Sequence, residues 1–77
     1  MKQRFETLDV WLAAYLQLYY QPPEFEVKSG RVVFVFPITD DLYRTIADFN
    51  GNVKTPIGSY INIVKNLRGQ MFSARGK

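Results

Sequence analysis

The sequence predicts an α+β fold in which a short N-terminal strand, a helix, a β-hairpin and two C-terminal helices pack on a small antiparallel sheet. Three observations support this order. A helical repeat of apolar residues runs over residues 8–20, and segments in which polar and apolar residues alternate flank Ser29 and Gly30. Amphipathic segments with helix-capping residues follow Pro37 and Thr55. No internal repeat or long linker divides the 77 residues, so we expect a single domain spanning 1–77.

The first helix is expected from Leu8 to Tyr20, because its large apolar residues fall within an arc of about 160° at 100° per residue. Thr7 is the predicted N-cap, and Pro22 with Pro23 ends the helix. The side away from this arc carries small residues, which would let a second surface approach closely.

A hairpin is predicted over residues 24–36, around a two-residue turn at Ser29 and Gly30. This turn pairs Lys28 with Arg31, Val27 with Val32, Glu26 with Val33, Phe25 with Phe34, and Glu24 with Val35. The second strand is apolar on both faces, which is typical of a central strand. Because two strands alone are marginally stable, we expect a third, either residues 3–6 or a strand from a second copy.

Two further helices are predicted after the hairpin. The first begins with Thr39 as N-cap and ends near Gly51, and the second begins with Thr55 as N-cap. The residues of the last helix expected to face inward are Ile57, Tyr60, Ile61, Val64 and Leu67, together with Met71 if the helix extends that far. The sequence does not decide where the last helix ends. If Gly69 ends it, residues 70–77 form a flexible basic tail; otherwise the helix continues to about residue 74.

The composition removes most kinds of catalytic and metal site. The chain has no histidine and no cysteine, the side chains most often used as general bases, activated nucleophiles and transition-metal ligands. The neighbouring acids Glu24 and Glu26 fit an exposed strand, and Asp40 with Asp41 fits the first turn of a helix. We therefore expect no enzyme activity, no metal and no cofactor.

Nothing in the sequence indicates secretion or membrane insertion. The longest apolar run, residues 10–16, is far shorter than the roughly 20 residues that span a bilayer. The first residues are followed by Glu6 and Asp9 instead of a long apolar run with a small-residue cleavage site. We expect a soluble, cytoplasmic protein with no membrane partner.

Charge is distributed unevenly along the chain. Residues 24–50 hold five acids and three bases, a net charge of −2, whereas residues 51–77 hold five bases and no acid, a net charge of +5. Clustered bases supply the phosphate contacts that dominate non-specific nucleic-acid binding. The candidate nucleic-acid contacts are Lys54, Lys65, Arg68, Phe72, Arg75 and Lys77. The alternative is that the bases complement the helix dipole, with Arg68 paired to Asp48 or to another acid.

Self-association is the second hypothesis. The candidate residues are Val10, Ala13, Ala14, Tyr20, Val33 and Val35, which lie away from the predicted core faces of the first helix and of the second hairpin strand. The sequence thus predicts a non-catalytic interaction module that forms a homo-oligomer. The alternative is weak, salt-sensitive nucleic-acid binding through the basic C-terminal helix.

The opening of the chain also resembles a known family. Residues 5–16 read F-E-T-x-D-x-x-L-A-A-Y-L, and the apolar strand at 32–36 and two helical segments follow. In this layout the chain resembles a family of small bacterial and phage-encoded domains of unknown function. The resemblance implies a stand-alone domain in a bacterial or phage intracellular setting, and it implies no activity, ligand or catalytic residue.

Overall fold

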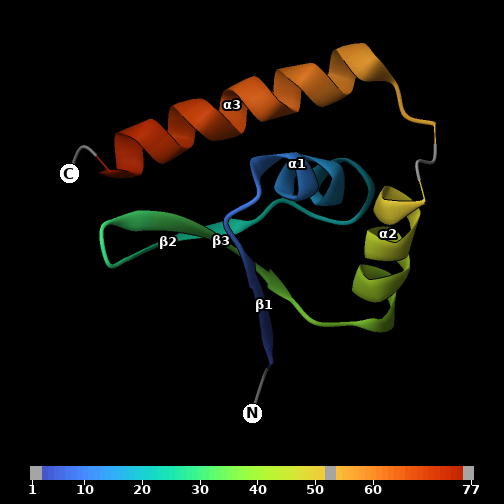
Figure 1. The fold of residues 1–77 in the computed structure, drawn as a ribbon, viewed down its shortest axis with the longest axis horizontal. Coiled ribbons are helices and arrows are strands. Elements are labelled where there is room, and N and C mark those ends of the chain that lie inside the picture. The colour runs from blue at the N-terminus through green and yellow to red at the C-terminus, as the bar shows by residue number, and fades with distance from the viewer. Residues whose placement is uncertain (1–2, 52–53, 76–77) are drawn as a thin grey trace.

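The computed structural model describes residues 3–51 and 54–75. Within these residues the chain forms β1 (Arg4–Thr7), α1 (Val10–Tyr19), β2 (Glu24–Lys28), β3 (Arg31–Pro37), α2 (Asp40–Asn50) and α3 (Ile57–Arg75). Figure 1 shows α3 running across α1 on the side away from the strands, with α2 beyond the end of β3. The predicted fold class and order of elements are confirmed.

The sheet has β3 at its centre, in the order β1-β3-β2, and both pairings are antiparallel. The hairpin has the predicted register throughout, from Lys28 opposite Arg31 to Glu24 opposite Val35. Ser29 and Gly30 have φ values of 52° and 77°, the positive values that a two-residue hairpin turn of type I′ requires. The third strand, β1, comes from the N-terminal segment of the same chain. This was one of the two predicted alternatives, the other being a strand from a second copy.

The predicted N-cap of the first helix was wrong by two residues. Asp9 caps α1, because its Oδ1 accepts hydrogen bonds from the backbone N–H groups of Trp11 (2.9 Å) and Leu12 (3.2 Å). Thr7 belongs to β1, where it lies opposite Phe34, and its hydroxyl accepts from the Asp9 N–H at 3.1 Å. Strand pairing therefore keeps Thr7 extended and delays the start of the helix.

Helix α1 is covered on more than one side. It contacts α3, α2 and β1, and both Ala13 and Ala14 are fully buried. They share the core with Val64 and Leu67 of α3 and with Leu42 of α2, among other residues. The small side chains do allow a close approach, but the approach is made by other elements of the same chain.

Helix α3 continues through Gly69 to Arg75, so residues 70–75 are helical and do not form the tail that one alternative predicted. A glycine inside a helix costs about 1 kcal/mol relative to alanine. Leu67 is buried and Met71 is partly buried against the core, so packing on both sides of Gly69 offsets that cost. The final two residues lie outside the described part of the chain.

The buried stripe of α3 differs from the predicted one. Val64 and Leu67 are buried as expected, and Tyr60 and Met71 pack against the core as well. Ile57 and Ile61, which were expected to face inward, are 70% and 39% exposed. The helix is rotated so that Ile63 packs against the core, which leaves a flank of apolar residues accessible to solvent.

Candidate functional site

The outer face of the sheet places charged side chains over apolar ones. Val33 and Val35 of β3 are 8% and 5% exposed. In the register of the sheet Glu26 of β2 lies opposite Val33, and Glu6 of β1 lies opposite Val35. Because β3 is the central strand, any contact between the outer-face side chains of β1 and β2 passes above these valines.

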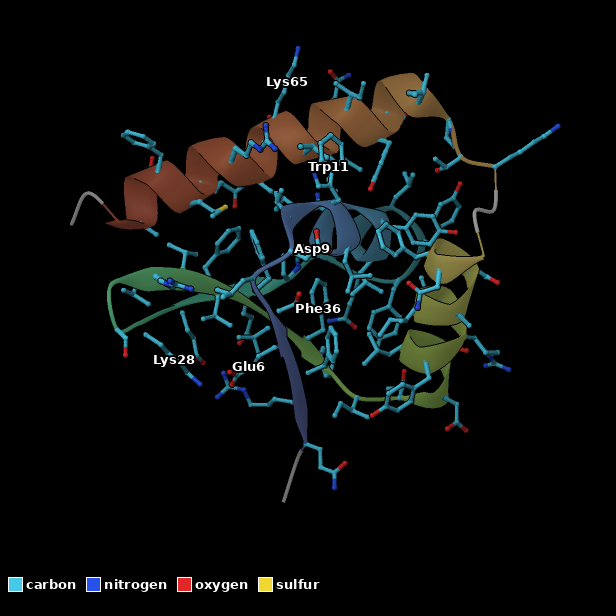
Figure 2. All side chains as sticks on the ribbon, viewed as in Figure 1. Glu6, Asp9, Trp11, Lys28, Phe36 and Lys65 are labelled. Atoms are coloured by element: carbon cyan, nitrogen blue, oxygen red, sulfur yellow. The ribbon has the colours of Figure 1, made fainter. Side chains whose placement is uncertain are left out.

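Four side chains make that contact, and we call them the ion-pair cover: Arg4, Glu6, Glu26 and Lys28. Lys28 Nζ lies 2.8 Å from Glu6 Oε2 and 4.0 Å from Glu26 Oε1, and Arg4 Nη2 lies 3.5 Å from Glu6 Oε2. Arg4 also pairs closely with Glu26. Figure 2 shows Lys28 and Glu6 together on the side of the sheet away from α3.

The ion-pair cover lies over Val33 and Val35, two of the residues that the sequence predicts for self-association. Each base contacts both acids, so the cover is neutral and its side chains span β3 from both edges. The hydrogen bond from Arg4 lowers the pKa of Glu26, which keeps this carboxylate charged. The two valines are therefore almost fully buried, although Val33 still lines an open groove beside Arg31.

The other predicted self-association residues also fail to form one surface. Ala13 and Ala14 lie in the core, and Val10 is half-buried against it. Tyr20 is half-buried too, and its hydroxyl donates to the carbonyl of Pro37 at 2.8 Å. The prediction that Ala13 and Ala14 contribute to a self-association surface was wrong, because the middle of α1 is covered on several sides and has no face exposed to solvent.

A different surface combines exposed aromatic and basic side chains, and we call it the α3 face: Trp11, Ile61, Lys65, Arg68 and Phe72. All five are exposed, with Trp11 at 45% and Phe72 at 81%. Lys65, Arg68 and Phe72 are spaced three and four residues apart, which places them along one side of the helix. In Figure 2 Trp11 projects from the start of α1 toward α3, and Lys65 projects away from the core.

Trp11 is held in place by α3. The Arg68 guanidinium lies over its ring, with Cζ 5.5 Å from the ring centroid, and the Tyr60 ring lies 5.8 Å away. The Tyr60 hydroxyl donates to the Trp11 carbonyl at 2.7 Å. Burial, together with the nearby Asp9 carboxylate, raises the pKa of Tyr60, so this hydroxyl keeps its proton.

The predicted pairing of Arg68 with Asp48 was wrong. In the part of the chain that the structure describes, Arg68 belongs to no ion pair, and it contacts the face of Trp11 instead. An exposed contact of this kind contributes about 0.5–1 kcal/mol and leaves the positive charge available to solvent. Arg68 therefore combines an organised position with an uncompensated charge.

The remaining predicted nucleic-acid contacts lie toward the ends of α3. Lys54 is exposed just before the helix begins. Arg75 is the last residue of α3, and Lys77 lies outside the described residues. The structure thus brings together three of the six predicted contacts, Lys65, Arg68 and Phe72, in the α3 face.

An open groove borders the α3 face on the side of β2. Its volume is about 520 Å³, and it is lined by Phe25 of β2 and by Lys65, Asn66, Gly69, Gln70, Ser73 and Ala74 of α3. Lys65 belongs to both surfaces. The groove adds amide and hydroxyl groups to the bases and aromatic rings of the neighbouring face.

Sequence reasoning missed Trp11 as a surface residue. It placed Trp11 inside an apolar arc of about 160°, although a helix at the surface of a small domain needs an apolar stripe of only about 100°. The excess width of the arc was the signal that one edge would be exposed. Which edge that is depends on where α3 packs.

The described residues give no sign of a metal site or a membrane span. Within them, no three side chains of the His, Cys, Asp or Glu types are grouped as metal ligands. Across residues 3–51 and 54–75, no helix combines the length and apolar character that a bilayer crossing requires.

The protein is therefore a small α+β domain in which an aromatic and basic helix face lies opposite a sheet face covered by ion pairs. The model of a family described as Domain of unknown function (DUF5659) matches residues 2–73, and the chain belongs to this family. Neither the search of curated proteins nor the search of solved structures gives a significant match.

Proposed function

We propose that the domain is a non-catalytic interaction module that binds nucleic acid weakly, in a salt-sensitive manner, through the α3 face. The observation that carries the proposal is the placement of Arg68 over Trp11, between Lys65 and Phe72, on a helix without acids. Exposed bases that have no acid beside them attract phosphates, and ordered aromatic side chains next to them add contact area.

Charge supports this proposal over a second copy as the main partner. Two α3 faces brought together would place bases against bases, which is unfavourable, whereas Lys65 and Arg68 attract a polyanion. Four of the six predicted self-association residues are also buried, two in the core and two under the ion-pair cover. The cytoplasmic location and the bacterial or phage setting stay predictions from the sequence.

The expected affinity is low because the number of bases is small. If Lys54, Lys65 and Arg68 each contact one phosphate, the logarithm of the binding constant falls with the logarithm of salt concentration with a slope of about −2 to −3. Dedicated nucleic-acid binders that contact six to ten phosphates have steeper slopes. Binding should therefore be measurable at low salt and nearly lost at high salt.

The test is fluorescence anisotropy of a labelled oligonucleotide at several salt concentrations. The double variant Lys65→Ala with Arg68→Ala should reduce the salt slope by about 2, because each lost phosphate contact removes about 1. Arg44→Ala is the matched control, since Arg44 is an exposed base on α2 that pairs with Asp41. Absence of binding by the unmodified protein at low salt would contradict the proposal.

Self-association through the first half of α3 is the second candidate. Ile57 and Ile61 lie one turn apart and are 70% and 39% exposed. Static light scattering at about 100 μM would then give a mass above 9.0 kDa, and Ile57→Asp would restore the monomer mass. Salt distinguishes the two candidates, because it screens the repulsion between α3 faces and so favours self-association while it weakens nucleic-acid binding.

A further inference from the structure

We infer that the nucleic acid bound by the α3 face is single-stranded, and that its unpaired bases stack on Trp11 and Phe72. This inference rests on the proposed function and adds the class of nucleic acid to it. Phosphate contacts alone do not distinguish single strands from duplexes. The distinction must come from the aromatic rings and from the shape of the surface around them.

The exposure of Phe72 is the first argument. At 81% exposed it contributes little to the core, and it follows Arg68 by one helical turn. Bases in a duplex are stacked on one another and offer no free faces, whereas every base of a single strand does. The exposed Phe72 ring beside basic side chains therefore gains contacts with a single strand that a duplex does not provide.

The arrangement of Trp11 is the second argument. The Arg68 guanidinium over its ring and the Tyr60 ring beside it fix the orientation of the indole before any ligand arrives. A planar guanidinium is itself a surface on which a base stacks. The Trp11 and Arg68 pair therefore offers a stacking surface with a positive charge attached to it.

The groove beside α3 is the third argument. Phe25 of β2 forms one wall, so the groove runs between the helix and the hairpin and has a volume of only about 520 Å³. A double helix is too wide to enter such a space, because the major groove of B-DNA alone is about 12 Å wide. Exposed base edges of a single strand can instead meet the amide and hydroxyl groups of Asn66, Gln70 and Ser73.

Lys65 connects the two parts of the surface. It lines the groove and lies one turn before Arg68 on the α3 face. A nucleic-acid strand that crosses α3 at this point would have its backbone near Lys65 and Arg68. Its nucleobases could then reach both the groove and the α3 face. Because the stacking partners are sequence-tolerant, we expect little preference among bases.

The experiment uses the intrinsic fluorescence of Trp11, since the chain has a single tryptophan. The full chain is titrated at low salt with oligo(dT), with a duplex of equal length, and with inorganic polyphosphate, which has no bases. We expect oligo(dT) to quench Trp11 and to bind at least about fivefold more tightly than the duplex. Polyphosphate should bind without comparable quenching.

Phe72→Ala provides the test of stacking, because Phe72 is too exposed to support the fold. It should weaken oligo(dT) binding at least about fivefold and leave polyphosphate binding unchanged. Tyr43→Ala is the matched control, since Tyr43 is an exposed aromatic residue on α2, and it should change neither.

Two results would overturn the inference in distinguishable ways. Equal affinity for all three polyanions, with no effect of Phe72→Ala on oligo(dT) binding, would reject stacking while the proposed function stands. Failure of all three to bind at low salt would reject the proposed function and this inference together.

Discussion

The outer face of the sheet and the α3 face both place charged side chains next to apolar ones. On the sheet, two bases and two acids from β1 and β2 pair with one another across Val33 and Val35. On α3, Lys65 and Arg68 have aromatic neighbours and no acid on their own helix. Side chains of alternating charge therefore cover an apolar surface, whereas side chains of one sign leave it available to a partner of the opposite sign.

The largest effect should come from the buried side of α3. Leu67→Ala removes a side chain that is 1% exposed and should lower the free energy of unfolding by about 2–5 kcal/mol. Phe72→Ala, on the exposed side of the same helix, should change it by no more than about 0.5 kcal/mol. Urea denaturation followed by circular dichroism measures both, and equal losses would mean that Phe72 is structural.

A smaller effect is expected when the ion-pair cover is removed. Glu6→Ala with Glu26→Ala leaves Arg4 and Lys28 without their partners and opens the path to Val33 and Val35. Stability should fall by less than in Leu67→Ala, because partly exposed ion pairs contribute little. Oligonucleotide binding measured by fluorescence anisotropy at low salt should rise, however, because the outer face of the sheet then carries charge of one sign, as the α3 face does. Arg44→Ala, which breaks the separate pair with Asp41, should leave this binding unchanged.

The cover should also depend on pH. Its acid Glu26 has a lowered pKa in the folded protein because Arg4 donates a hydrogen bond to the carboxylate. This contribution to stability is therefore fully present above the ordinary glutamate pKa, and it is lost as the pH falls through the lowered value. Urea midpoints measured from pH 7 down to acid should fall less steeply in Glu26→Gln than in the unmodified protein. Identical pH profiles would mean that Glu26 does not contribute.

The smallest effect on stability should come from making the α3 face resemble the sheet. Phe72→Glu gives Arg68 an acid four residues later, so the two charges can pair along the helix. The free energy of unfolding should change by no more than about 0.5 kcal/mol. Oligonucleotide binding should nevertheless fall below that of Phe72→Ala, because the acid also repels phosphates. A variant that binds as well as Phe72→Ala would show that charge on this face is unimportant.

Local patterns predicted the sheet well. The two-residue turn at Ser29 and Gly30 fixes the hairpin register without reference to the rest of the chain, and the apolar run after it indicates a central strand. The cap of α1 was harder, because Thr7 and Asp9 are both good caps and only the pairing of Thr7 with β3 decides between them. The choice depended on a contact far away in the sequence.

The α3 face was only partly predictable for the same reason. Lys65, Arg68 and Phe72 belong to one helix, so their spacing was visible in the sequence. Trp11 joins them only because α3 crosses the beginning of α1. The sequence also predicted that Ile61 faces inward, whereas the structure shows Ile63 against the core and Ile61 39% exposed.

The burial of Ala13 and Ala14 has a consequence for folding during synthesis. These residues belong to the second element of the chain, yet the core around them includes Val64 and Leu67 of the sixth. As the chain leaves the ribosome, α1 emerges long before α3, so this part of the core stays open until residue 67 is outside the exit tunnel. The nascent chain therefore exposes the apolar residues of α1 from their emergence until α3 can pack on them, and in this period such surfaces associate with chaperones or with one another.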